Sequence, residues 1–306
     1  MKKIIYDLVV AYRIYPKISK STPVFQNNKF KLAHLCLKSF KESLGSLNIK
    51  IYVLLDNCPP EYEELFYRYF KKENLEIIRL NGIGNQRTFK LQLDLLLKQN
   101  YSEIVYFAED DYFYFPNQFE IMLNFLKKNI DVDFVTPYDH LDYYVLPLHD
   151  YKSIFKNYST KQWKKVSSTT CTFLTSKTAL NKTKKVFKKY SYVKNFFDSE
   201  IFKQNRILNC IFSEFMISAS DTDIWLSLTK INAFKLLKLI RYRIQNREAF
   251  GFYFRAWRFH WNQILFGKKW NLYCPKPTIA THMESICLSP NINWEEIFKK
   301  ASLEIE

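Results

Sequence analysis

The feature that most constrains the fold is an unbroken apolar run at residues 104–108, Ile-Val-Tyr-Phe-Ala, that ends directly in three acidic residues. A continuous run of this length, with β-branched and aromatic members, is typical of a strand buried on both faces, as in a parallel sheet. Open α/β sheets bind their ligands at the carboxyl ends of such strands. Glu109, Asp110 and Asp111 therefore occupy a predicted ligand-binding position.

Three adjacent carboxylates repel one another and resist ionising together unless a cation or hydrogen-bond donors offset their charge. A hard divalent cation such as Mn²⁺ or Mg²⁺, shared with a substrate phosphate, would supply that charge. The alternative is a solvated acidic turn without a ligand. The buried strand in front of the triplet favours the metal site over the turn.

The first 130 residues repeat a strand-helix pattern four times. Strands are predicted at residues 6–12, 49–55, 75–80 and 104–108, and helices at 30–44, 61–72, after Arg87 to near Gln99, and from Asn117. Further strands are predicted at 133–137 and 167–174, and further helices at 178–190 and 198–215. This alternation predicts an α/β fold with a mostly parallel sheet flanked by helices.

The domain organisation is predicted from the same pattern, which loses its regularity after residue 137 without any low-complexity linker. We expect a catalytic domain over residues 1–230 and a helical C-terminal extension over residues 231–306 that packs on the same domain. The extension is expected to hold a basic, aromatic-rich amphipathic stretch from Phe234 onward and a return strand that contains His282.

Composition restricts the compartment and the partners. The six cysteines are scattered and form no C-x-x-C pair, which argues against a zinc ribbon or a disulfide scaffold and suits a reducing cytosol. We expect a cytoplasmic protein, with peripheral attachment to the inner face of the plasma membrane as a further expectation. The net charge of +16 has four open explanations: AT-rich coding DNA, an anionic membrane surface, anionic substrates, or nucleic acid.

The acidic triplet behind a strand-helix half-domain resembles the metal-binding motif of GT-A fold glycosyltransferases, which use nucleotide-sugar donors. Some inverting N-acetylglucosaminyltransferases carry it in the same Glu-Asp-Asp form. In that family the last carboxylate binds the metal that bridges the donor diphosphate, which implies Asp111 here. Glu109 is grouped at the same metal site, with a purely structural role as the alternative. Asp110 would lie near the donor ribose or sugar. The resemblance implies a UDP-sugar donor, with a GDP-sugar as the alternative.

A second segment, residues 220–228, resembles the Glu-Asp-Thr-Asp-Leu segment of glycosyltransferase family 2. In that family the aspartate after the glutamate is the catalytic base, which implies Asp221. Ser220 departs from the family's glutamate, so Asp223 remains a rival for the base. The structural alternative is a helix N-cap made by Ser220 or Asp221.

The resemblance also implies donor-binding positions. In GT-A proteins the ends of the first two strands hold the nucleotide, and the residues at those ends are Ala11, Tyr12, Arg13 and Asp56. Asn85 and Arg87 resemble the polar residues that precede the metal-motif strand, and the Arg87 guanidinium could contact the diphosphate. The alternative for Arg87 is an ordinary surface position at a helix start.

Two histidines are candidates for the site. Many GT-A enzymes use a C-terminal histidine as a further metal ligand or phosphate contact, and His282 is placed to match, although a lone histidine is more often an ordinary surface or core residue. His140, beside Asp139 and Asp142, is the best candidate on the acceptor side.

These residues together predict a metal-dependent, inverting hexosyl- or N-acetylhexosaminyltransferase that acts on a glycan or lipid-linked acceptor in bacterial surface polysaccharide synthesis. One alternative is a nucleotidyltransferase or phosphotransferase that uses the same carboxylates and metal. The other is a non-catalytic nucleic-acid-binding protein, which the dispersed Lys and Arg residues disfavour. We therefore expect a nucleotide-sugar donor and a sugar acceptor as partners, and no nucleic acid.

Overall fold

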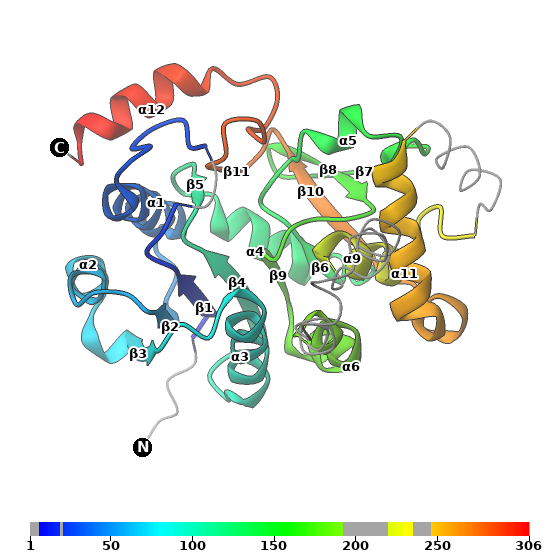
Figure 1. The fold of residues 1–306 in the computed structure, drawn as a ribbon, viewed down its shortest axis with the longest axis horizontal. Coiled ribbons are helices and arrows are strands. Elements are labelled where there is room, and N and C mark those ends of the chain that lie inside the picture. Colours follow the sequence, from blue (N-terminus) through cyan, green and yellow to red (C-terminus); the bar gives the residue numbers. More distant parts are fainter. Residues whose placement is uncertain (1–5, 19–20, 192–219, 235–245, 306) are drawn as a thin grey trace, which may run out of the picture.

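The computed structural model describes residues 6–18, 21–191, 220–234 and 246–305. Within these ranges, nine strands form one sheet in the order β3-β2-β1-β4-β9-β6-β10-β8-β7, with helices on both faces (Figure 1). The expected α/β class is confirmed. No described helix has the length and the apolar character needed to cross a membrane.

The strands of this sheet are β1 (Leu8–Ile14), β2 (Ile49–Asp56), β3 (Leu75–Leu80), β4 (Ile104–Glu109), β6 (Phe134–Val135), β7 (Phe155–Tyr158), β8 (Lys161–Val166), β9 (Phe173–Ser176) and β10 (Leu272–Lys276). A separate two-stranded sheet consists of β5 (Tyr112–Tyr114) and β11 (Ala280–His282). The α-helices are α1 (Lys29–Leu44), α2 (Glu61–Tyr69), α3 (Asn85–Lys98), α4 (Phe119–Lys128), α5 (Asp142–Val145), α6 (Lys177–Lys188), α9 (Asp221–Thr229), α11 (Arg247–Phe266) and α12 (Trp294–Leu303). Short 3₁₀ helices are η1 (Lys72–Asn74), η2 (Pro147–His149) and η3 (Lys189–Ser191).

The strand order has a reversal point between β1 and β4. The chain moves outward from β1 through β2 to β3, and then returns to add β4 on the other side of β1. These four strands are parallel, as predicted, whereas β9, β8 and β7 make the second half of the sheet mixed. Ligands of open α/β sheets bind where the strand order reverses, at the carboxyl ends. The fold therefore places a binding site between the ends of β1 and β4.

The central strand β4 is buried on both faces, as its apolar run predicts. On one face Tyr106 packs edge-on against Phe119, with ring centroids 4.9 Å apart. On the other face Phe107 stacks on Phe173, with centroids 4.5 Å apart. Helices α1, α2 and α4 cover the first face, and α3, α6 and α9 cover the second. This two-sided burial fixes the end of β4, where the acidic triplet begins.

Side-chain caps explain where several helices begin. The Asn28 side chain accepts from the Lys31 backbone N–H at 3.0 Å at the start of α1, and the Ser176 hydroxyl accepts from Ala179 N–H at 3.0 Å at the start of α6. The helix start predicted at Asn117 is wrong by one residue, because Gln118 is the N-cap of α4. Asn117 adopts a left-handed backbone conformation with φ 56°, which ends the turn before α4 and cannot lie inside a helix.

The region between β6 and α6 differs most from the predictions. The strand predicted at residues 167–174 begins only at Phe173, because the chain before it is held by other groups: Ser167 O accepts from the Thr229 hydroxyl at 2.8 Å, and Ser168 O from the Tyr143 hydroxyl at 2.6 Å. Strands β7 (Phe-Lys-Asn-Tyr) and β8 (Lys-Gln-Trp-Lys-Lys-Val), which contain few apolar residues, were not predicted. The predicted loop at residues 140–144 overlaps the short helix α5. The helix predicted at 198–215 and residues 235–245 of the predicted amphipathic stretch lie outside the described residues.

The C-terminal residues complete the sheet. Strand β10 lies between β6 and β8, so the predicted boundary at residue 230 does not separate two packing units. The return strand that contains His282 is present as β11, and it pairs antiparallel with β5 so that His282 lies opposite Tyr112. Helix α12 packs beside α1, where Trp294 and Phe298 contact Phe113. The last described helix thus lies against the first.

Candidate functional site

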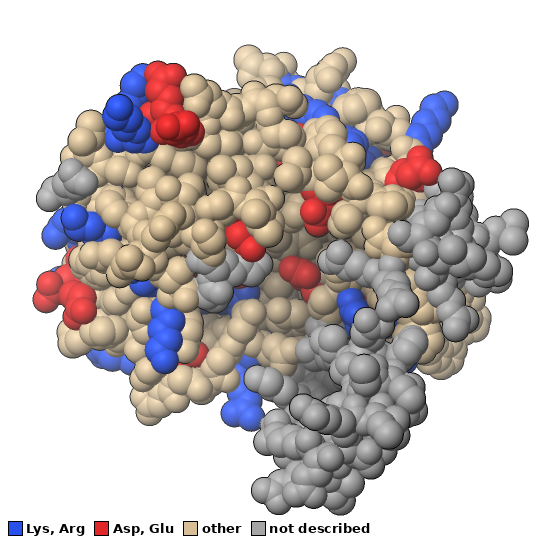
Figure 2. All heavy atoms as spheres, turned by 45° about the horizontal axis from the view of Figure 1, so that its top comes forward, with Lys and Arg blue, Asp and Glu red and all other residues tan. Residues whose placement is uncertain are grey.

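A pocket of about 210 Å³ opens at the carboxyl ends of β1 and β4. Figure 2 shows Asp and Glu side chains gathered at a hollow near the centre of one face. Its described lining comes from the ends of β1 and β4, the start of α3, the loop after β6, the segment before β9, the first turn of α9, and β11 with the loop after it. This is the place at which the strand order reverses.

Glu109 is balanced by Arg13. The two residues are register partners on the adjacent strands β4 and β1, and their side chains form an ion pair. The Thr172 hydroxyl also donates to Glu109 at 2.8 Å, and Arg13 donates to the Asn85 carbonyl at 2.8 Å. Burial alone would lower the pKa of Arg13, but Glu109 raises it above its ordinary value. The Glu109 carboxylate thus pairs with the Arg13 guanidinium, whereas the resemblance implies that it binds a metal.

The negative charge of Asp110 is balanced by Lys29, a residue that no local sequence pattern identifies. Lys29 lies in the first turn of α1, and its Nζ is 2.9 Å from Asp110 Oδ2. The Tyr15 backbone N–H donates to the same oxygen at 3.2 Å. Burial raises the pKa of Asp110, and Lys29 opposes that rise. Asp110 is buried and is held by these contacts to α1 and the end of β1.

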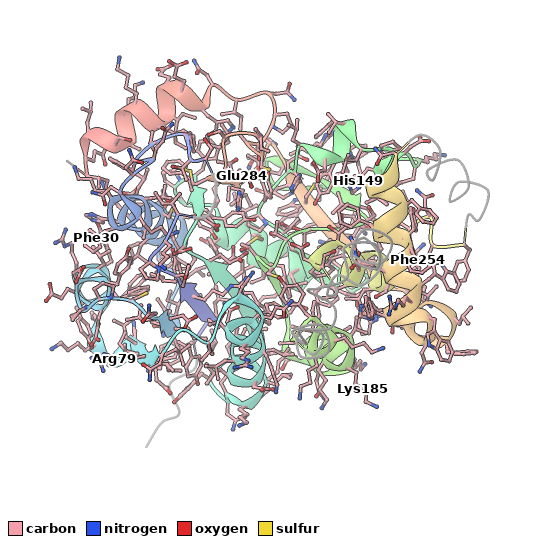
Figure 3. All side chains as sticks on the ribbon, viewed as in Figure 1. Phe30, Arg79, His149, Lys185, Phe254 and Glu284 are labelled. Carbon is pink, nitrogen blue, oxygen red and sulfur yellow. The ribbon has the colours of Figure 1, made fainter. Side chains whose placement is uncertain are left out.

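Asp111 is balanced by His282. Asp111 Oδ2 lies 3.2 Å from His282 Nε2, and His282 Nδ1 lies 3.8 Å from a carboxylate oxygen of Glu284. Burial would raise the pKa of Asp111, but His282 brings it well below its usual range. The second oxygen, Oδ1, is buried and has no hydrogen-bond partner among the described residues. Figure 3 labels Glu284 in this region, near β11.

Each carboxylate of the triplet therefore has a different cationic partner. Of these partners only the imidazole of His282 is also a metal ligand. The unpartnered Oδ1 of Asp111 and the adjacent His282 fit a divalent cation. Within the described ranges no three His, Cys, Asp or Glu side chains form a metal-binding group, so the chain's described residues would need the substrate's oxygens to complete the coordination.

Asp221 and Asp223 occupy different environments at the start of α9. Asp221 lines the pocket, and its carboxylate accepts from Thr222 N–H at 2.8 Å. Asp223 is 0% exposed, and it accepts from Ser220 N–H at 2.8 Å and from Arg255 Nε at 3.0 Å. The N-cap alternative is confirmed for Ser220, which forms a capping box with Asp223. Burial raises the pKa of Asp223 to about 6, against the opposing effect of Arg255.

The donor-binding positions are only partly brought together. Arg13 and Asn85 line the pocket, whereas Arg87 is exposed on the first turn of α3 outside the pocket lining. Ala11 and Tyr12 are both 0% exposed, because β1 continues two residues further than predicted, to Ile14. The predicted end of this strand is therefore wrong, and Ala11 and Tyr12 lie in the buried part of β1.

Two polar residues next to the pocket hold the backbone. The buried carboxylate of Asp56 accepts from Ile83 N–H and Gly84 N–H, both at 2.8 Å, and so fixes the turn before α3. The side-chain amide of Gln92 donates to Ala11 O at 2.7 Å and to Ala108 O at 3.0 Å, which bridges β1 and β4. Gln92 was not identified from the sequence, where it is one polar residue inside a helical pattern.

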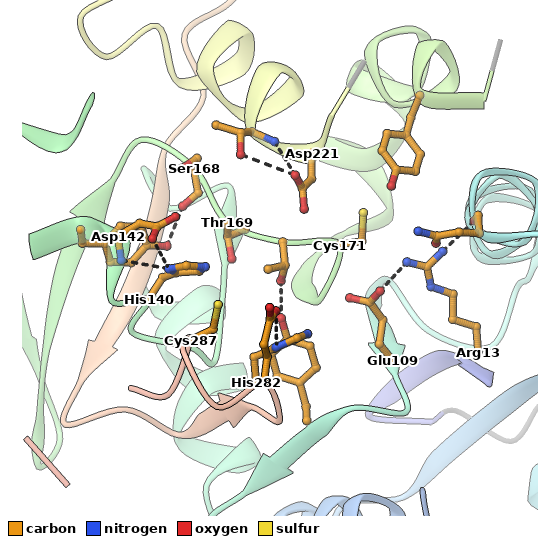
Figure 4. A pocket seen from close by; sticks show the side chains of 17 residues that line it. Arg13, Glu109, His140, Asp142, Ser168, Thr169, Cys171, Asp221, His282 and Cys287 are labelled. Carbon is orange, nitrogen blue, oxygen red and sulfur yellow. Dashed lines mark hydrogen bonds and ion pairs between the residues drawn. The ribbon is translucent and has the colours of Figure 1, made fainter. Parts of the chain in front are cut away.

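The far wall of the pocket contains His140, Asp142, Tyr143, Ser168 and Thr169. The Asp142 backbone N–H donates to His140 Nδ1 at 3.0 Å. Figure 4 shows His140, Asp142 and Ser168 on the side of the pocket opposite Arg13 and Glu109. Asp139 is buried and accepts from the Tyr144 hydroxyl at 2.6 Å, so of the two aspartates near His140 only Asp142 lines the pocket.

No protein-family model matches the chain, and no curated protein matches its sequence significantly. Several solved structures are similar. The mannosyltransferase PcManGT from Pyrobaculum calidifontis in complex with GDP-Man and Mn²⁺ is 14% identical with a TM-score of 0.30, over 43% of this chain and 35% of that chain. The galactosyltransferase LgtC in complex with donor and acceptor sugar analogs is 11% identical with a TM-score of 0.43, over 97% and 95%. S. aureus TarS 1–349 in complex with UDP-GlcNAc is 12% identical with a TM-score of 0.41, over 82% and 91%. At these identities and scores the likeness assigns no residue a role.

Proposed function

We propose that this protein is a metal-dependent, inverting glycosyltransferase that moves a hexosyl or N-acetylhexosaminyl group from a nucleoside-diphosphate donor to a hydroxyl of a glycan or glycolipid. The observation that carries the proposal is Asp111, whose buried Oδ1 has no partner among the described residues and whose Oδ2 faces His282 at the reversal point of the sheet. Asp221 lines the same pocket as His282 and supplies the second group that the reaction needs.

Asp111 and His282 are the residues that would hold the metal. A carboxylate oxygen beside an imidazole nitrogen suits Mn²⁺ better than Mg²⁺, which prefers oxygen ligands. When bound, such a cation supplies Lewis-acid stabilisation of the diphosphate leaving group. The ion pairs of Glu109 with Arg13 and of Asp110 with Lys29 keep the two neighbouring carboxylates in place around that position.

Asp221 is the proposed base. In the transfer, the acceptor oxygen bonds to the anomeric carbon while the bond from that carbon to the diphosphate oxygen breaks, and the electron pair leaves with the diphosphate. The proton of the acceptor hydroxyl passes to the Asp221 carboxylate. Attack from the face opposite the leaving group inverts the anomeric centre. Asp223 is unsuited to this role because its carboxylate is buried against Arg255.

The pocket has two ends. We place the nucleotide of a UDP- or GDP-sugar at the donor end, which consists of Arg13, Asn85 and Glu109. We place the sugar that accepts the transfer at the acceptor end, which consists of His140, Asp142, Tyr143, Ser168 and Thr169. Asp221 and His282 lie between the two ends in Figure 4, which is where the bond would form.

Transfer of a nucleotidyl group is the closest alternative, since it would use the same carboxylates and metal. A nucleoside triphosphate carries more negative charge than a nucleotide sugar and calls for more cationic contacts. Among the described lining residues Arg13 is the single Lys or Arg, and Glu109 already pairs with it. The charge of the pocket therefore favours sugar transfer.

A cytoplasmic site on the inner face of the plasma membrane would suit a role in bacterial surface polysaccharide synthesis, where acceptors are lipid-linked. Helix α6 carries five lysines and no acidic residue, and Lys185 projects from its outer side in Figure 3. At the end of α11, Trp261, Leu265 and Phe266 are exposed, and Phe266 is 78% exposed. Lys189, directly after α6, donates a hydrogen bond from Nζ to the backbone carbonyl of Phe259 in α11 and so joins these two regions. Lysines beside exposed aromatic residues are typical of surfaces that bind anionic lipid.

The metal site is tested by thermal unfolding of the wild type and of Asp111→Asn with UDP-, GDP-, CMP- and dTDP-sugars, each with and without Mn²⁺. We expect at least one donor to stabilise the wild type by about 2.7 kcal/mol at 100 times its Kd, which corresponds to an unfolding temperature about 5 °C higher, and to do so more strongly with Mn²⁺. Asp111→Asn should lose the Mn²⁺-dependent part.

Asp131→Asn is the matched control, because Asp131 is exposed and pairs with Lys156 away from the pocket. It should behave as the wild type. The proposed function fails if no nucleotide sugar stabilises the wild type, and the metal assignment fails if Asp111→Asn keeps the full Mn²⁺-dependent shift.

A further inference from the structure

The acceptor end of the pocket offers a hydrogen-bond donor of fixed position. Because the Asp142 backbone N–H donates to His140 Nδ1 at 3.0 Å, the neutral imidazole carries its proton on Nε2. The ring packs on Tyr138 and Tyr143, with centroids 4.8 Å and 6.0 Å away. His140 therefore presents an N–H group whose direction is set by its neighbours.

The same end offers a carboxylate that can only accept. The Asp142 carboxylate lies 3.5 Å from His140 Nδ1, and its side chain is 43% exposed at the pocket wall. A sugar hydroxyl both donates and accepts a hydrogen bond, so it can pair with the carboxylate and the imidazole N–H together. A carboxylate or phosphate on the acceptor has no proton to donate at neutral pH and would face the charge of Asp142.

The hydroxyl-rich wall behind these groups is held in place. The Thr169 hydroxyl donates to the Thr136 hydroxyl at 2.8 Å, and the Thr170 hydroxyl accepts from Tyr112 at 2.8 Å. The Ser168 carbonyl accepts from Tyr143 at 2.6 Å. A wall fixed in this way discriminates by the groups it already presents, because it cannot rearrange at low cost around a charged acceptor.

The charge of the whole pocket also disfavours an anionic acceptor. Its described lining has four carboxylates, on Glu109, Asp142, Asp221 and Glu284, and one guanidinium, on Arg13, which pairs with Glu109. A concave site lined with one sign of charge concentrates ligands of the opposite sign and repels those of the same sign, while neutral ligands are not repelled. The donor's own negative charge would be offset by the cation that Asp111 and His282 would hold, whereas no Lys or Arg among the described lining residues belongs to the acceptor end.

We infer that the acceptor end selects neutral or amine-bearing sugars and rejects acceptors that carry a carboxylate or a phosphate, with Asp142 and His140 as the specificity-determining residues. This inference rests on the proposed function. Because the inference concerns only the acceptor, it is tested by measuring acceptor preference under conditions in which donor binding is unchanged.

The test uses the full chain, the donor that stabilises it most, Mn²⁺, and a glycan array with neutral, amino, uronic-acid, sialylated and phosphorylated members. We expect labelling of neutral or amino glycans at least about tenfold above acidic ones. Asp142→Asn should lower kcat/KM for the preferred neutral acceptor about 10- to 100-fold, since it replaces a charged hydrogen-bond acceptor. The same variant should narrow the difference between neutral and acidic acceptors, while donor-induced stabilisation and slow donor hydrolysis stay unchanged.

Asp131→Asn is again the matched control, and it should keep both the rate and the preference. Equal or stronger labelling of acidic glycans overturns the inference, as does an unchanged preference in Asp142→Asn, or the absence of any labelling while the donor is hydrolysed. Absence of both donor binding and donor hydrolysis refutes the proposed function itself, which separates the two failures.

Discussion

At the scale of single residues, Asp111 differs from its two neighbours in the partner that balances its charge. Arg13 and Lys29 are permanent cations at neutral pH. The charges of Glu109 and Asp110 are therefore already neutralised by other side chains of the protein. The partner of Asp111 is an imidazole, which can exchange a proton for a metal. Adjacent residues of one motif therefore take different roles because different elements meet them.

Asp221 and Asp223 give the sharpest test at this scale. Asp221→Asn should lower transfer by about 10²- to 10⁴-fold, because the base is lost. It should leave donor-induced stabilisation and unfolding free energy close to wild type. Asp223→Asn should lower the unfolding free energy by about 3 kcal/mol, because Arg255 would be buried without its charged partner. Urea unfolding and transfer rates of both variants at pH 7 check this.

The two variants serve as controls for each other. If Asp221→Asn keeps its turnover while a folded Asp223→Asn loses it, the role of the base moves to Asp223. Equal losses of stability in both variants would contradict the different environments of the two carboxylates.

The site could be predicted from sequence where a residue ends or begins an element. The triplet ends β4, Asp221 begins α9 and His282 lies on β11, and local patterns predict such positions. Lys29 and Gln92 could not be predicted in the same way. Their contacts with Asp110 and with the backbone of β1 and β4 depend on how separate elements pack, and a single sequence contains no local pattern for that.

At the scale of elements, the parallel half of the sheet was predictable and the mixed half was not. Strands buried on both faces have continuous apolar sequences, which are easy to identify. Strand β8 instead has three lysines, two of them buried, and only two apolar residues, and β7 is an edge strand with exposed positions. The position of β10 between β6 and β8 depends on long-range pairing that no local periodicity records.

Two histidines should make the elements that hold them sensitive to acid. His149 lies in η2, and His260 lies at a non-helical residue within α11. Burial lowers the pKa of each to about 3. Since the folded pKa is lowered, the stability contribution is complete above the unfolded pKa of about 6.5 and is lost as the pH falls toward 3. From pH 7 to 5 the two groups together should cost about 4 kcal/mol of unfolding free energy.

His260→Leu isolates half of this effect, because neither ring nitrogen of His260 has a hydrogen-bond partner in the described part of the chain. Urea unfolding at pH 7, 6 and 5 should show that wild type loses about 2 kcal/mol more than the variant between pH 7 and 5. Carboxylates with a raised pKa, such as Asp223, contribute the opposite slope to both proteins, and the difference between the proteins removes it. Parallel pH profiles would show that His260 does not stay neutral in the folded state.

At the scale of the whole molecule, the charge is unevenly placed. The protein is strongly basic, yet the described pocket lining is acidic and the lysines of α6 lie on the other side of the sheet from α1, α2 and α4. The acidic pocket suits a metal and neutral sugars. The lysine-rich surface beside the exposed aromatic residues of α11 suits an anionic membrane.

Membrane attachment is tested by sedimentation with vesicles of phosphatidylcholine alone or mixed with phosphatidylglycerol. We expect binding to the anionic vesicles at low salt that weakens as ionic strength shortens the range of the charges. Lys182→Glu with Lys185→Glu should weaken binding at least about 30-fold, since each lysine near an anionic surface contributes about 1 kcal/mol. Both lysines are exposed on α6.

The charge-matched control is Lys71→Glu with Lys72→Glu, which changes two exposed lysines beside α2. It should bind almost as well as wild type. The membrane proposal fails if wild type does not bind anionic vesicles at low salt, or if the two double variants weaken binding equally.

The insertion of β10 between β6 and β8 has a consequence for synthesis on the ribosome. The central sheet stays incomplete, and β6 lacks one neighbour, until residues 272–276 have left the exit tunnel. The apolar side of α1 that α12 covers stays exposed even longer. The nascent chain must therefore hold a partly formed sheet with an open edge through most of translation, a state in which chains tend to aggregate or to recruit chaperones.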